Sequence, residues 1–162
     1  MGIWDKQGRW CDDEESIAQV AISYFDNIYN SSHPSLIEEV IEAIPSMVTD
    51  EMNESLIREF TRDEAVVALK QIHPNKAPEL DGMFAVFFQK HWSIVGNNIT
   101  DMILYVLNHN IPILELNKTN ISLIPKISNP KRMTDFRPIS LCNVVYKLIS
   151  KILASRLKPL LP

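Results

Sequence analysis

The chain has 162 residues, a length that suits one ordinary domain or a smaller domain with an added arm. Hydrophobic residues make up 46% and charged residues 22%, as in globular proteins, and no apolar run is long enough to span a membrane. The N-terminus lacks the pattern of a secretory signal, and Cys11 lies far in sequence from Cys142. We therefore expect an intracellular chain without a disulfide framework or a zinc site.

The net charge of −4 hides a difference between the two halves of the chain. Residues 1–69 hold four basic and fifteen acidic residues, whereas residues 70–162 hold twelve basic and five acidic residues. Such an asymmetry indicates that only the second half faces a polyanion such as nucleic acid. The alternative is that both halves are ordinary solvated surfaces.

The acidic half predicts short capped helices. Asp12 or Asp13 caps the first helix, which is expected to end near Asn30. Its apolar residues recur at helical spacing and form one stripe: Ile17, Val20, Ala21, Tyr24 and Ile28. Residues 36–44 form a short amphipathic piece, and Thr49 can cap another segment.

A capping box predicts the start of the next helix, because Glu64 lies three residues after Thr61. It must end by His73, since Pro74 disfavours a helical residue before it. Residues 74–82 form a loop with two prolines and an Asp-Gly turn, and we place the main joint of the chain there. A long apolar, partly aromatic stripe follows over residues 84–106, with a break or kink expected near Gly96.

The sequence pattern of the basic tail differs from that of the predicted helices before it. Residues 119–124 alternate polar and apolar as a half-buried strand does. Residues 136–141 read as a second strand, which Pro138 confines to an edge or a strand start, and the basic loop 128–135 joins the two strands into a hairpin. The last element, residues 143–160, is an amphipathic helix with Val145, Ile149, Ile152 and Leu157 on one side. The sequence therefore predicts an α+β, predominantly helical fold with one small antiparallel hairpin.

The usual catalytic patterns are missing. The chain has no glycine-rich phosphate loop, no metal-ligand spacing among its histidines and no nucleophile elbow. Two-metal nucleotidyl transfer needs carboxylates clustered on a rigid apolar scaffold. The acids of the basic half do not form such a pair: Glu79, Asp81, Asp101, Glu115 and Asp135. We predict no catalytic and no metal-binding residue, and we interpret Asp81 and Asp135 as turn and cap residues.

A phosphate-binding surface remains. Lys126 ends the first strand of the hairpin, and Arg137 lies inside the second. Long basic side chains on neighbouring antiparallel strands can converge on one phosphate group. The alternative is a pair of solvated charges.

Three motifs in this region are typical of one family. Residues 76–82 follow Lys-Ala-Pro-x-x-Asp-Gly, residues 123–126 are Leu-Ile-Pro-Lys, and residues 135–141 are Asp-Phe-Arg-Pro-Ile-Ser-Leu. Together they resemble the opening motifs of plant LINE-type (non-LTR) retrotransposon reverse transcriptases. Residues 151–162 look like the helix that follows the fingers hairpin in that family, and the resemblance covers nearly the whole chain.

The resemblance implies a division of the chain and a role for its basic residues. Residues 1–73 would be an acidic helical connector, and residues 74–162 a partial reverse-transcriptase domain that holds the RNA template, the DNA primer and the incoming nucleotide. Lys126 and Arg137 become candidates for phosphate contacts, and Lys76 a weaker one. The magnesium-binding aspartates of the family lie downstream in the palm, so we expect this chain to be inactive alone, without a cofactor of its own.

Two further points qualify the resemblance. Glu79 and Leu80 stand where the family has Gly-Pro, which puts in doubt the turn and any contact by Lys76. The hairpin and the last helix would pack on the palm, so we expect their apolar faces to be exposed. Two alternatives remain: a non-catalytic module for nucleic-acid binding or protein interaction, and a remnant without function. Nucleus and cytoplasm are not distinguished.

Overall fold

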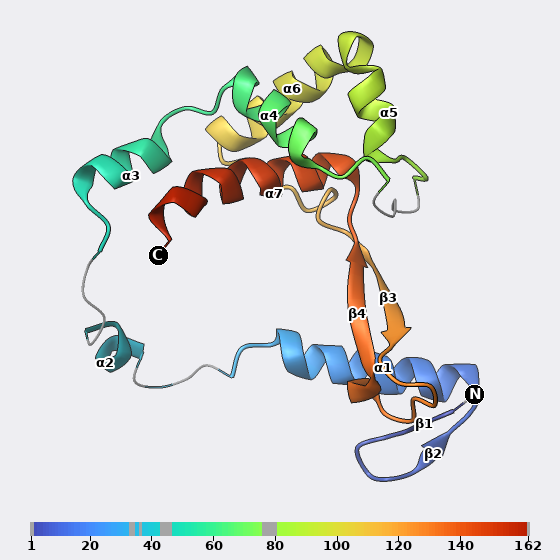
Figure 1. The fold of residues 1–162 in the computed structure, drawn as a ribbon. Coiled ribbons are helices and arrows are strands. Elements are labelled where there is room, and N and C mark those ends of the chain that lie inside the picture. Colours follow the sequence, from blue (N-terminus) through green and yellow to red (C-terminus); the bar gives the residue numbers. More distant parts are fainter. Residues whose placement is uncertain (1, 33–34, 36, 43–46, 76–80, 162) are drawn as a thin grey trace. The chain divides into compact units, whose positions relative to one another are not determined.

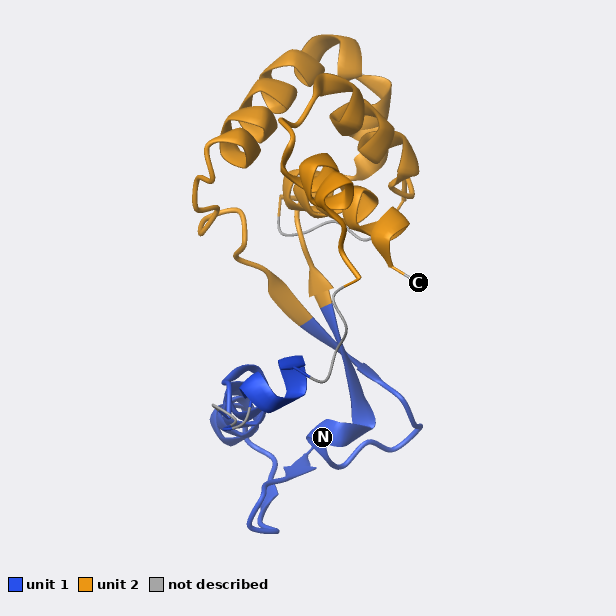
Figure 2. Cartoon of the chain, turned by 90° about the vertical axis from the view of Figure 1, so that its left-hand side faces the viewer, with its two compact units in different colours: residues 1–45, 122–139 blue, residues 46–121, 140–162 orange. Residues whose placement is uncertain are grey.

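The computed structural model describes the chain except residues 1, 33–34, 36, 43–46, 76–80 and 162. The chain forms two compact units, residues 1–45 with 122–139 and residues 46–121 with 140–162 (Figure 2). Helices dominate the described residues, alongside two two-stranded sheets, which confirms the predicted α+β, mostly helical class. The functional division expected after residue 73 follows neither unit boundary and stays a prediction. No helix in the described ranges is long and apolar enough to cross a membrane.

The first unit opens with a small hairpin of β1 (Ile3–Trp4) and β2 (Trp10–Cys11), which pair antiparallel. Asp5 organises its turn, because Oδ1 accepts the backbone N–H groups of Gln7 at 2.9 Å and Arg9 at 2.8 Å. Gly8 takes a positive φ of 76°, which glycine adopts without steric strain. These hydrogen bonds and the positive φ of Gly8 stabilise the turn of the hairpin.

Helix α1 (Glu14–Tyr29) begins and ends as predicted. Asp13 caps it by accepting the N–H of Ser16 at 2.9 Å, and Asn30 is its C-cap. The predicted stripe packs against buried Ile3, Met133 and Phe136. Ile28 is an exception, because it lies exposed in the last turn of the helix. Helix α2 (Ile37–Glu42) follows within the predicted amphipathic piece.

The predicted basic hairpin is present as β3 (Asn120–Pro125) and β4 (Phe136–Leu141), which form a two-stranded sheet and run in opposite directions (Figure 1). Their connection contains a short 3-10 turn, η1 (Met133–Asp135). Both strands are edges, so Pro138 of β4 is tolerated as expected. Residues 122–139 of this hairpin belong to the first unit.

The second unit is helical: α3 (Asp50–Ile57), α4 (Arg62–Gln71), α5 (Ala85–Lys90), α6 (Trp92–Asn108), α7 (Val144–Leu157) and the short η2 (Lys158–Leu160). Thr49 caps α3, and both halves of the predicted capping box between Thr61 and Glu64 are formed at α4. The core gathers buried residues from α4 to α7: Ala65, Ala68, Leu69, Ile72, Ala85, Ile103, Val144, Leu148, Ile149 and Ile152.

The break in the aromatic stripe lies at His91, between α5 and α6, so the prediction of a break near Gly96 is wrong. Gly96 continues α6 and is buried under a neighbouring side chain, since a Cβ there would stand 2.7 Å from the Trp92 ring. The turn at His91 lets Phe88 and Trp92, one from each helix, pack on the same core. The absence of a side chain at Gly96 thus allows the Trp92 ring to pack closely against the backbone of α6.

The apolar face of α7 is buried inside the chain. Val144, Leu148, Ile149 and Ile152 pack in the core of the second unit, chiefly with α4. The expectation that this face would be exposed is therefore wrong, and only its last turn behaves differently, with Leu157 exposed. Helix α4, within this chain, covers the face of α7 that we had expected to pack against a palm.

Candidate nucleic-acid interface

The two faces of the β3–β4 hairpin differ in character. Phe136 is buried and Leu123 packs beside it against the core of the first unit. Because strand side chains alternate between faces, Ile124 and Arg137 lie on the opposite, outward face. Ile139 shares that face, and both isoleucines are exposed. The outward surface of the hairpin is thus mixed apolar and basic.

Lys126 stands where β3 ends and extends this surface. Its backbone N–H donates to the carbonyl of Asp135 across the hairpin at 2.8 Å, so the strands still pair there. Its Nζ donates to the carbonyl of Thr134 at 2.9 Å, and the side chain is exposed. An ammonium has three donors, so two N–H groups remain for a ligand while the third positions the side chain.

Arg137 is exposed on β4, and no hydrogen bond or ion pair joins its guanidinium to the residues that the structure describes. A buried internal ion pair would have argued against phosphate binding. The structure therefore brings Lys126 and Arg137 to one outward face, with Arg137 able to present a planar fork of donors. Lys76, the third candidate, lies outside the described residues.

Asp135 and Asp81 take the structural roles expected of them. Asp135 Oδ2 accepts the backbone N–H groups of Lys131 and Arg132, each at 2.9 Å. The hydrogen bond from Lys131, then that from Arg132, holds the pKa of Asp135 below its usual value. Asp81 Oδ1 accepts the N–H of Met83 at 2.9 Å, and Gly82 has a positive φ of 67°, so the predicted turn is confirmed.

The described residues contain no group of three or more His, Cys, Asp or Glu side chains placed to hold a metal ion. The outward surface of the β3–β4 hairpin offers hydrogen-bond donors for anions, together with apolar contact area. Such a surface has the chemistry to hold a polyanion in place.

Sequence reasoning missed the role of one basic residue, Arg156 of α7. Its side chain is 6% exposed and forms an ion pair with Glu64 of α4, so it is not available to nucleic acid. The Arg156 guanidinium holds the pKa of Glu64 down at about 2. No local pattern distinguishes this arginine from its solvated neighbours. The sequence identified Glu64 as a capping residue, but it did not show that Arg156 is a second partner of this carboxylate.

No family model matches the chain. The chain is similar to the Transposon TX1 uncharacterized 149 kDa protein of Xenopus laevis, with 29% identity over 161 residues. The match covers 98% of this chain and 12% of that protein. The similarity supports a retrotransposon origin of this chain. The chain spans about one eighth of the length of the relative that it matches.

Proposed function

We propose that this chain is part of a plant-like, non-LTR (LINE-type) reverse transcriptase, an RNA-directed DNA polymerase. The β3–β4 hairpin would be part of its fingers and grip the phosphates of an RNA template or an incoming nucleotide. One observation carries the proposal: the hairpin presents Lys126 and Arg137 on a single outward face, within the motifs that resemble that family.

The chemistry of this face suits a phosphate chain. The guanidinium of Arg137 can donate two parallel hydrogen bonds to phosphate oxygens, and Lys126 adds a point charge. Exposed Ile124 and Ile139 supply contact area for sugar or base. Contacts of this kind position a strand without reading its sequence, and they weaken as salt rises.

Catalysis is assigned to other parts of the enzyme. The proposed polymerase joins nucleotides with magnesium held by palm aspartates, and the described residues of this chain include no such group. The role of this chain is then to hold the RNA template or the incoming nucleotide. We expect no primer extension by the chain alone with magnesium, and synthesis by it would contradict this assignment.

A second candidate is a non-catalytic nucleic-acid-binding module derived from the same family. It is favoured by the core of the second unit, in which α7 buries its apolar face within the chain. A unit that closes its own core can fold without a palm to cover it. This candidate shares the gripping surface and differs in lacking a polymerase around it.

The test is a titration of the purified chain with single-stranded RNA at several salt concentrations, followed by fluorescence anisotropy. Lys126→Ala combined with Arg137→Ala should weaken binding and reduce the slope of log K against log salt by about 1.4. The matched control removes two exposed lysines of other elements, Lys70→Ala with Lys90→Ala, and loses the same charge. Equal effects of the two double variants, or no binding at low salt, would remove the proposal.

A further inference from the structure

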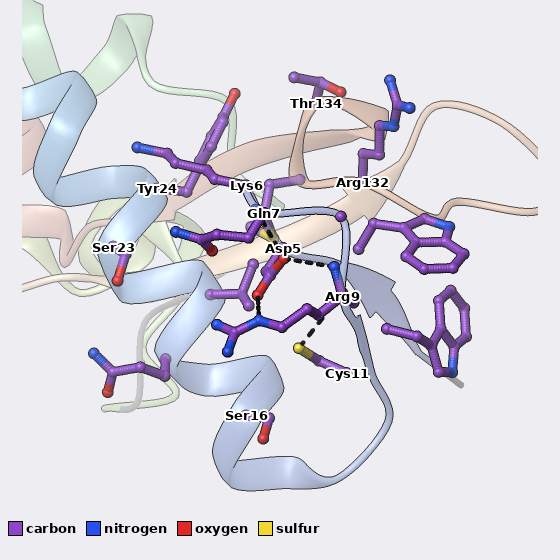
Figure 3. A pocket seen from close by; sticks show the side chains of 16 residues that line it. Asp5, Lys6, Gln7, Arg9, Cys11, Ser16, Ser23, Tyr24, Arg132 and Thr134 are labelled. Carbon is purple, nitrogen blue, oxygen red and sulfur yellow. Dashed lines mark hydrogen bonds and ion pairs between the residues drawn. The ribbon is translucent and has the colours of Figure 1, made fainter.

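A hollow of about 1180 Å³ lies entirely within the first unit. Three segments line it: the β1–β2 hairpin, one side of α1, and residues 132–134 of the basic loop (Figure 3). The backbone N–H of Trp4 donates to the carbonyl of Lys131 at 2.7 Å and so fixes the first segment to the third. A backbone hydrogen bond therefore joins two of the three segments that line the hollow.

Two exposed tryptophans stand on one of these walls. Trp4 and Trp10 face each other across the β1–β2 pair, with ring centroids 5.0 Å apart and planes at 65°. Trp4 is 40% and Trp10 43% exposed, while the core beside them is filled by Ile3. A Cβ on Gly2 would lie 2.5 Å from the Trp10 ring, so this ring rests on bare backbone. Large rings held in place but left open to solvent are suited to stacking with a nucleobase.

Cations outnumber acids on the lining. Lys6, Arg9 and Arg132 line the hollow, and Asp5 is the single acidic residue among the lining residues. Its carboxylate is already engaged, because Oδ2 accepts from Nε of Arg9 at 2.7 Å (dashed in Figure 3). This bond holds the Arg9 guanidinium by one nitrogen and leaves its two terminal nitrogens for a ligand. The hollow thus combines positive charge with aromatic rings.

Hydroxyl groups complete the lining: Ser16, Ser23, Tyr24 and Thr134. Ser23 and Tyr24 come from α1, and Thr134 lies next to Arg132 in the basic loop (Figure 3). Hydroxyls both donate and accept, so they can bond phosphate oxygens or the 2′-hydroxyl of a ribose. No catalytic arrangement is needed for such binding.

We propose that this hollow binds a short stretch of single-stranded nucleic acid, with a base stacked on Trp4 or Trp10 and phosphates held by Arg9 and Arg132. The volume slightly exceeds that of usual small-molecule pockets, roughly 300–1000 Å³, which favours a stretch of strand over one free nucleotide. The site goes beyond the proposed function. It uses neither Lys126 nor Arg137, and it holds whether or not the chain belongs to a polymerase.

The experiment follows tryptophan fluorescence of the whole chain while an unstructured oligouridine is added at low salt. Stacking on Trp4 or Trp10 should quench the emission, while Trp92 in the second unit supplies a constant background. In parallel, uridine monophosphate and inorganic phosphate are titrated as separate probes. Quenching by the oligomer at concentrations at which the monophosphate has no effect supports the strand. Equal affinity for the monophosphate overturns it.

The variants separate stacking from charge. Trp4→Leu should weaken oligomer binding roughly tenfold, as expected for the loss of one stacked base, while Trp4→Phe keeps most of the affinity. Arg132→Gln should lower both the affinity and the salt dependence. Its matched control is Lys131→Gln, which removes the neighbouring exposed charge of the same loop without touching the lining.

Two outcomes overturn the site: no quenching at saturating oligomer, or equal losses from Arg132→Gln and Lys131→Gln. Arg132→Gln keeps the test informative if Trp4→Leu disturbs folding, because Arg132 is exposed. Lys126→Ala with Arg137→Ala should leave the quenching in place. Failure of the hairpin surface and failure of this hollow are thereby distinguishable.

Discussion

Arg156 on α7 clasps Glu64 on α4 in a bidentate ion pair, with Nε 2.7 Å from Oε1 and Nη2 3.0 Å from Oε2. The guanidinium also lies 3.6 Å from the ring centroid of Phe60. Its other N–H groups donate to backbone carbonyls at the end of α3 and in the segment that follows it: Leu56, Arg58 and Glu59. One side chain thus joins the last long helix to a turn far earlier in the chain.

Replacing Arg156 by alanine should strongly destabilise the second unit. The substitution removes the charged partner of the Glu64 carboxylate and the donor to several backbone carbonyls, and breaking a buried pair costs about 3 kcal/mol or more. Urea unfolding measures the loss. The matched control is Arg62→Ala, whose pair with Asp101 has side chains 55% and 59% exposed and should contribute less than about 1 kcal/mol. Similar losses in both variants would contradict the assigned role.

The same pair predicts a pH dependence of stability. The hydrogen bonds from Arg156, and then those from Thr61, lower the pKa of Glu64 from 4.5 to about 2, so the folded chain holds this carboxylate charged more firmly than the unfolded chain does. The stabilisation by the charged Glu64 is complete at a pH above the pKa of this residue in the unfolded chain. It is lost as pH falls from 4.5 toward 2. In Glu64→Gln this titration is absent. The difference in unfolding free energy between wild type and variant should therefore shrink on acidification, and a constant difference would speak against the coupling.

Gly96→Ala should destabilise the chain, although glycine inside a helix is usually less favourable than alanine by about 1 kcal/mol. The reason is space, because the added Cβ would meet the Trp92 ring at 2.7 Å. Thermal unfolding and the emission maximum of tryptophan report the change. Asn97→Ala, exposed in the same helix, should be neutral or mildly stabilising. A stabilised Gly96→Ala would show that the ring moves aside without loss.

Asp135→Ala should loosen the basic loop without unfolding the hairpin. The carboxylate accepts two consecutive backbone N–H groups, and alanine leaves them to solvent. Faster hydrogen exchange at Lys131 and Arg132 is expected, with little change at β4 residues such as Ile139. Acidification below the usual range of an aspartate should reproduce the effect in the wild type, because the pKa of Asp135 is lowered in the folded chain.

Local patterns predicted the elements well where the cause is local. Asp13, Thr49 and Thr61 each cap the helix that they were expected to begin, because an N-cap depends only on the next few residues. The β3–β4 hairpin was also predicted from two short strand-like runs, and its strands lie within one residue of the predicted bounds. The two main phosphate candidates could be placed on neighbouring strands for the same reason.

What the sequence could not provide depends on partners far away in the chain. Glu64 lies 92 positions before Arg156, so no window of sequence could join them. The fit of Trp92 against Gly96 depends on side-chain packing that composition does not encode. The hollow at Trp4 and Trp10 likewise needs a loop from residues 132–134, although two tryptophans flanking basic residues were a visible signal.

The way the chain is divided between its units has a practical consequence. It passes from one unit to the other after residues 45, 121 and 139, so neither unit is a continuous stretch of sequence. A single proteolytic cut at one of these three crossings leaves the two units still joined covalently through the other two crossings. A C-terminal truncation before residue 139 removes part of both units. Neither half of this fold can therefore be produced as one continuous segment of the chain.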